Sequence, residues 1–173
     1  MLAYVFWHSP QAGVDPTAYE GALLRFHRSL DPTEIDGFHN SSVFRIDAVP
    51  WMTGSLVYED WYLLTNFSAL GTLNIAAVSG HRQPPHENVA LLAEQGTAGV
   101  YALRHGLELI SDEGRAAWFP KPAGTSSDQV VRVTGGRGQL WQRQLVLGPT
   151  PEFCVIAGDA PPDAVVVTRT SVS

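Results

Sequence analysis

The sequence predicts an α+β fold in which two similar halves pack sheet against sheet. Over residues 1–107 the expected order of elements is strand, helix, strand, strand, helix, strand, which is the order of the ferredoxin-like split β-α-β unit. Residues 108–173 follow the same outline in shortened form, as expected for an internal copy. We therefore predict a ferredoxin-like half over 1–107 and a shortened second ferredoxin-like half over 108–173.

Composition limits the class of protein. Hydrophobic residues make up 45% and charged residues 16% of the chain, so a sizeable core can form and disorder is not expected. The net charge of -6, without clustered Lys and Arg, argues against a nucleic-acid partner. The apolar start of the chain has no basic segment before it and reaches His8 too early for a signal peptide or a membrane span. The single Cys154 cannot form an internal disulfide, which favours a cytoplasmic location.

The elements of the first half follow from local signals. Residues 2–8 form an apolar run typical of a buried strand. Asp15 and Pro16 are the expected N-cap and first residue of a helix, whose apolar face is Tyr19, Leu23, Phe26 and Leu30. Alternating patterns predict a hairpin of two strands, 41–48 and 56–64. Helices are expected at about 67–79 and 85–95, and a strand at 97–105.

The second half contains a local echo of the first. Residues 6–13 (FWHSPQAG) and residues 118–124 (WFPKPAG) each run from an aromatic pair through proline to Ala-Gly. Later extended runs are predicted at 139–147, 152–157 and 164–171, and the Gly-rich residues 134–138 are expected to be a hairpin turn.

In element order and in this echo, the chain resembles a fused member of the dimeric α+β barrel superfamily. The resemblance implies two ferredoxin-like halves packed sheet to sheet as a pseudo-dimeric α+β barrel, with a site in the barrel mouth. Members of that superfamily include cofactor-free oxygenases, small-molecule isomerases and dehydratases, haem enzymes and proteins without known activity. The resemblance therefore constrains function weakly.

His8 and Glu59 are the candidate catalytic residues. His8 ends a buried strand just before a loop, a position from which an imidazole can act as a base near neutral pH; the alternative is a histidine that hydrogen-bonds a neighbouring strand. Glu59 and Asp60 lie on opposite faces of one aromatic-rich strand, so one of them should be buried and paired with an arginine, Arg45 or Arg143. The alternative role of that carboxylate is a structural ion pair.

Arg143, Lys121, Trp61 and Trp118 are the candidate substrate-binding residues. Arg143 shares a face with Trp141, Leu145 and Leu147 and could clamp a carboxylate or stack on a ring. Lys121 is the only lysine and occupies nearly the loop position that His8 occupies in the first half. Two-fold pseudo-symmetry would place both side chains at one cavity mouth, whereas the alternative is a surface lysine.

Other side chains are assigned no chemistry. The six histidines fit no metal-binding spacing, and no metal or cofactor is expected. His27, between Arg25 and Arg28, is expected to be solvated, and Cys154 to be an inert core residue.

The first functional hypothesis is a small-molecule enzyme or binding protein with an aromatic-lined barrel pocket. Its ligand would be a small apolar or anionic molecule, and its chemistry cofactor-free proton transfer on an apolar carbonyl or phenolic substrate. The alternatives are a non-catalytic assembly protein of the same fold and a haem-binding protein. The oligomeric state, a homo-oligomer included, is left open.

Overall fold

Eight strands and the helices between them make up the described part of the chain. The computed structural model describes residues 1–107, 114–134, 138–144 and 148–173. Its elements, in chain order, are β1 (Leu2–Pro10), α1 (Pro16–Ser29), β2 (Phe38–Ile46), β3 (Val57–Leu64), α2 (Phe67–Ala77), the 3-10 turn η1 (Gly80–Arg82), α3 (Gln83–Leu92), β4 (Ala93–His105), β5 (Gly114–Phe119), α4 (Ser127–Val133), β6 (Gln139–Arg143), β7 (Phe153–Ile156) and β8 (Val165–Ser171). The element order predicted for residues 1–107 is confirmed.

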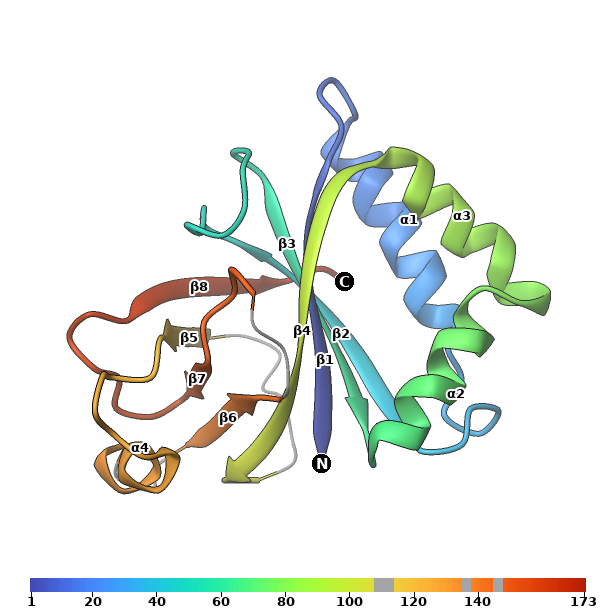
Figure 1. Ribbon diagram of the computed structural model, residues 1–173. Helices are drawn as coiled ribbons and strands as arrows, with labels where there is room; N and C mark the ends of the chain where they lie inside the picture. The colour runs from blue at the N-terminus through green and yellow to red at the C-terminus, as the bar shows by residue number, and fades with distance from the viewer. Residues whose placement is uncertain (108–113, 135–137, 145–147) are drawn as a thin grey trace.

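The strands form one closed antiparallel barrel, in the order β1-β3-β2-β8-β5-β7-β6-β4 (Figure 1). The predicted fold class, two ferredoxin-like halves packed sheet to sheet, is therefore wrong. The edge strands of the two expected sheets instead hydrogen-bond to each other, β2 to β8 and β4 to β6, so that the sheets join edge to edge. Strand makes up 38% of the described residues and helix 28%, and the barrel wall dominates the fold.

The helices lie outside this wall. Figure 1 shows α1, α2 and α3 together on one flank of the barrel and α4 on the other. The predicted start of α1 is confirmed, because the Asp15 side chain accepts a hydrogen bond of 3.1 Å from the backbone N–H of Ala18, with Pro16 in the first turn. None of the described helices is both long enough and apolar enough to cross a membrane.

Strand alternation separates the side chains into two cores. Along β1, Ala3, Val5 and Trp7 point into the barrel, where they join a cluster rich in tryptophan. Leu2, at the start of β1, and Tyr4 lie on the opposite face and pack against the helices. The two polar clusters described below lie on opposite faces of this wall.

The predicted second-half strands are confirmed only in part. The strands β7 and β8 match the extended runs expected at 152–157 and 164–171. The run expected at 139–147 begins as β6, but residues 145–147 lie outside the described residues, as do 135–137 of the expected turn.

Gly37 offers a test of the packing between α2 and the barrel. Gly37 and Gly13 have similar positive φ values, +75° and +84°, but a Cβ on Gly37 would lie 2.5 Å from the Cβ of Ala69 whereas one on Gly13 meets nothing within 4 Å. In both variants the alanine must adopt a positive φ, which costs about 1 kcal/mol of backbone strain. We expect Gly37→Ala to lower the free energy of unfolding by about 1–3 kcal/mol more than Gly13→Ala in urea denaturation. Equal losses would contradict this packing.

Candidate functional site

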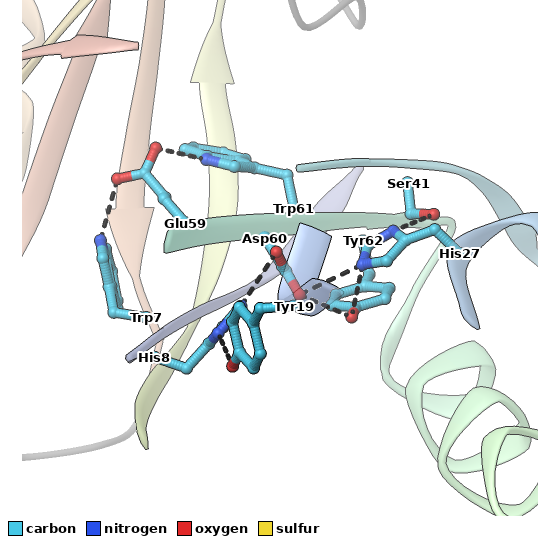
Figure 2. A network of polar contacts seen from close by, with 9 residues as sticks. All are labelled: Trp7, His8, Tyr19, His27, Ser41, Glu59, Asp60, Trp61 and Tyr62. Atoms are coloured by element: carbon cyan, nitrogen blue, oxygen red, sulfur yellow. Dashed lines mark hydrogen bonds and ion pairs between the residues drawn. The ribbon is translucent and has the colours of Figure 1, made fainter. Parts of the chain in front are cut away.

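Two consecutive carboxylates on β3 occupy opposite faces of the barrel wall. All eight residues of β3 are buried, and Glu59 and Asp60 are 0% and 2% exposed. Figure 2 shows Glu59 turned toward the indoles of the barrel interior and Asp60 turned toward side chains beneath the helices. The predicted burial of a carboxylate on this strand is confirmed for both residues.

Asp60 is the centre of a network between the barrel wall and α1 (Figure 2). Its Oδ1 lies 3.2 Å from Nε2 of His8, and its Oδ2 lies 3.1 Å from both Nε2 of His27 and the hydroxyl of Tyr62. The other ring nitrogens are also bonded: Nδ1 of His8 lies 2.7 Å from the Tyr19 hydroxyl, and Nδ1 of His27 lies 2.8 Å from Oγ of Ser41.

One set of proton positions satisfies these contacts. Burial acts to raise the pKa of Asp60, but His8 and His27, through charge and hydrogen bonding, outweigh it and hold that pKa below its ordinary value. An ionised Asp60 can only accept, so Nε2 of His27 carries a proton. Nε2 of His8 and Oδ1 of Asp60 lie at ion-pair distance without the alignment of a hydrogen bond, and the negative charge of Asp60 favours a proton on that nitrogen as well. Nδ1 of His8 is then an acceptor for the O–H of Tyr19. The geometry therefore presents an imidazole whose basic Nδ1 is hydrogen-bonded to Tyr19 and whose Nε2 faces a carboxylate.

The tyrosines of the network remain protonated. Burial, followed by the charge of Asp60, raises the pKa of Tyr19 and of Tyr62 above the ordinary value. Both hydroxyls therefore serve as hydrogen-bond donors.

A cleft of about 890 Å³ lies between this network and the helices. Its barrel side includes Tyr4, Phe6, His8, Asp60 and Tyr62, together with Ala93, Glu94, Gln95 and Gly96 at the start of β4. The rings of Tyr4 and Phe6 are nearly parallel, at 9° between their planes. The helix side is largely aliphatic and includes Leu70, Leu73, Ala77, Val78, Val89 and Ala90. The volume falls within the range of small-molecule sites.

Glu59 belongs to a separate site inside the barrel. Its two carboxylate oxygens accept hydrogen bonds from the indole N–H groups of Trp7, at 2.9 Å, and Trp61, at 2.8 Å. Burial raises the pKa of Glu59, while the charge of Arg169 and the indole donors act in the opposite direction. Arg169 is itself 2% exposed, and its guanidinium lies over the ring of Phe44 at 4.6 Å.

The prediction that an arginine would hydrogen-bond the buried carboxylate is wrong. Arg45 forms a surface ion pair with Glu20 at 3.5 Å. Arg143 donates to the carbonyl of Gly148 at 3.1 Å and to Thr150. Imidazoles and indoles replace the expected guanidinium. Trp7 of β1 lies directly across from Glu59, and Trp61 is on β3 itself, whereas Arg45 of β2 pairs with Tyr58.

The six candidate residues do not converge on one site. His8 lines the cleft. Trp61 and Trp118 lie in the barrel core with Glu59, and Trp118 also lines a second pocket of about 330 Å³ together with Arg143. Lys121 is exposed and lines neither of these two pockets. The expected pairing of His8 and Lys121 at one cavity mouth is therefore wrong.

Sequence reasoning missed three members of the network. His27 was expected in solvent but is 8% exposed and contacts Asp60. The available signal was its spacing, because His27 follows the buried Leu23 by four residues and so shares its helix face. Tyr19 was assigned to the apolar face of its helix without a polar role, and Tyr62 was given no role.

The sequence matches no protein-family model and no curated protein. Within the described ranges, no group of three His, Cys, Asp or Glu side chains is arranged to hold a metal ion.

Replacing Asp60 tests the ionised network. The pKa of Asp60 is lower in the fold than in the unfolded chain, so its ionisation stabilises the protein above about pH 4, and this stabilisation is lost as the pH falls toward the folded-state value. We expect Asp60→Asn to lower the free energy of unfolding by about 1–3 kcal/mol at neutral pH, and the deficit to shrink in acid. The exposed Asp36→Asn serves as the control in parallel denaturation curves. A deficit that does not change with pH would exclude an ionised Asp60.

Replacing Glu59 tests the barrel interior. In Glu59→Gln an amide N–H would face an indole N–H of Trp7 or Trp61, so one hydrogen bond is lost. We expect the free energy of unfolding to fall by roughly 1–3 kcal/mol. Denaturation curves monitored by tryptophan fluorescence measure this change. The exposed Glu94→Gln should change it by less than about 0.5 kcal/mol. If the two variants are equally stable, the carboxylate is not held as described.

Proposed function

We propose that this protein is an enzyme or binding protein for a small apolar molecule, with cofactor-free acid-base chemistry on a carbonyl or phenolic group. The supporting observation is His8, which lies between the ionised Asp60 and the Tyr19 hydroxyl at the wall of the cleft. A relationship to the dimeric α+β barrel superfamily remains part of the proposal, supported by barrel closure and by the helices outside the wall.

The lining of the cleft favours an uncharged, flat ligand. The described residues that line it include no Lys and no Arg, so an anion would find no fixed positive charge. The parallel rings of Tyr4 and Phe6 on one side and the aliphatic side chains of α2 and α3 on the other suit a planar ring system. Of the two ligand classes expected from the sequence, apolar molecules fit better than anionic ones.

The network can remove a proton from such a ligand in one concerted step. The acidic proton of the ligand passes to Oη of Tyr19 while Tyr19 passes its own proton to Nδ1 of His8. The products are a ligand anion, which Tyr19 then hydrogen-bonds, and an imidazolium whose Nε2–H faces the Asp60 carboxylate. The rings of Phe6 and Tyr58 stack on His8, with centroids at 5.0 and 5.6 Å, and their negative faces favour the imidazolium.

Haem fits this cleft less well. His86 lines the cleft and makes no hydrogen bond to another described residue, so its ring could face an iron. The two haem propionates, however, would find no Lys or Arg among the lining residues. We therefore derive no step through this group.

Binding of 1-naphthol, a neutral fused-ring phenol, tests the proposal. Naphtholate absorbs at longer wavelength than naphthol, so absorbance reports both binding and proton transfer. We expect wild type to bind the probe and to increase its ionised fraction, His8→Gln to bind without ionising it, and His86→Gln to behave as wild type. Ala77→Trp, which fills the cleft, should weaken binding by about tenfold or more.

Other outcomes would overturn the proposal. Equal binding by wild type and Ala77→Trp would place the probe outside the cleft. Equal ionisation by wild type and His8→Gln would exclude His8 as the base. Failure of neutral ring compounds to bind, together with an oligomer whose interface covers the cleft, would favour the assembly protein instead.

A further inference from the structure

The second histidine on Asp60 does not line the cleft. His27 belongs to α1, is 8% exposed and is not among the residues that surround the cleft volume. It nevertheless makes polar contacts with Asp60, Tyr62 and Ser41 at the back of the network. Its Nε2 lies 3.1 Å from both Oδ2 of Asp60 and the Tyr62 hydroxyl, its Nδ1 lies 2.8 Å from Oγ of Ser41, and its ring stacks on Tyr62 at 5.0 Å.

These contacts hold one oxygen of Asp60 and leave the other for His8. A carboxylate turns readily about its last side-chain bond, because that torsion has only broad preferences. Oδ2 is held by His27 and Tyr62, whereas Oδ1 faces His8 at 3.2 Å. If Oδ2 were released, the carboxylate would be free to turn, and Oδ1 would no longer be held opposite Nε2 of His8.

The position of Oδ1 decides which nitrogen of His8 is basic. With Oδ1 opposite Nε2, the neutral ring carries its proton on Nε2 and leaves Nδ1 to accept from Tyr19. Without that acceptor, Tyr19 could equally accept from Nδ1–H, and the basic nitrogen would face away from Tyr19. The same reasoning applies to His27, where the Ser41 hydroxyl donates to Nδ1 and so keeps the proton on Nε2.

We propose that His27 is a positioning residue of the cleft, which acts through Asp60 to fix the tautomer of His8 and thereby to aim its basic nitrogen at Tyr19. This role rests on the function proposed above, since it matters only if His8 accepts a proton. Other groups that contact the network are the hydroxyls of Tyr19 and Tyr62, the stacked ring of Tyr58 and the edge of Phe26. None of them contacts Asp60 except Tyr62, so His27 and Tyr62 together hold Oδ2.

Nitrogen-15 NMR of the histidine rings in the ligand-free protein tests this role. Wild type should show His8 as a single tautomer protonated on Nε2. His27→Phe keeps a ring beside Tyr62 but loses the donor, and we expect a mixture of tautomers at His8. The double variant His27→Phe/Tyr62→Phe removes both donors and should enlarge the minor tautomer further. His27→Gln, whose amide can donate to Oδ2, should restore the single tautomer.

The matched control is His86→Phe, which changes a histidine that lines the cleft but does not contact Asp60. Near-ultraviolet circular dichroism establishes that each variant is folded. Should the double variant not fold, Ser41→Ala gives the second measurement, because it removes the bond that keeps the His27 proton on Nε2, and it should also produce a mixture at His8.

A single His8 tautomer in folded His27→Phe, or an equal disturbance in His86→Phe, would overturn the positioning role. The result is separable from the proposed function because no ligand is present in the measurement. If the role holds and 1-naphthol is bound, folded His27→Phe should retain the probe, because His27 does not line the cleft, while the ionised fraction of the probe falls several-fold. If 1-naphthol is not bound by wild type, the proposed function fails while the tautomer measurement still decides what His27 does.

Discussion

The structure depends on burying two adjacent carboxyl groups in one strand. Every residue of β3 is buried, yet the middle of this strand reads Glu59-Asp60. Side-chain alternation sends these carboxylates to opposite faces of the wall, so no single partner can serve both. An unpaired buried carboxylate costs several kcal/mol, and each face must therefore supply its own donors.

The two faces meet this requirement with different chemistry. Inside the barrel, neutral indole N–H groups of Trp7 and Trp61 bond Glu59, and the nearest opposing charge comes from Arg169. Outside, imidazoles bond Asp60, and an imidazole can change its own charge near neutral pH. The inner arrangement is fully buried in the barrel core, whereas the outer one borders a cleft. This difference is why acid-base chemistry is assigned to the outer face.

Local signals predicted the elements well and the closure of the barrel poorly. The N-cap at Asp15, the hairpin and the burial of Glu59 follow from patterns within a few residues. The β2–β8 and β4–β6 ladders join residues far apart in the chain. The alternation of apolar and polar residues within a strand does not indicate which other strand it pairs with. The site follows the same division. His8 was proposed as a site residue because it lies at the end of its strand, but its contacts with Asp60 and Tyr19 depend on how β1, β3 and α1 pack together. His27 was wrongly placed in solvent because arginines flank it in the sequence.

The position of β8 in the barrel orders events during synthesis. The strand β2 pairs with β3, which follows it closely in the chain, but its other edge pairs with β8, which comes after the other seven described strands. A nascent chain that has reached β4 thus already carries every residue of the Asp60 network, while β2 and β4 still expose open edges of the kind that recruit other chains. The barrel interior, which includes the buried Arg169 of β8, can be completed only after β8 has been synthesised. The part of the molecule that borders the cleft can therefore assemble first, and the seam between β2 and β8 is the point most exposed to mispairing in the interval.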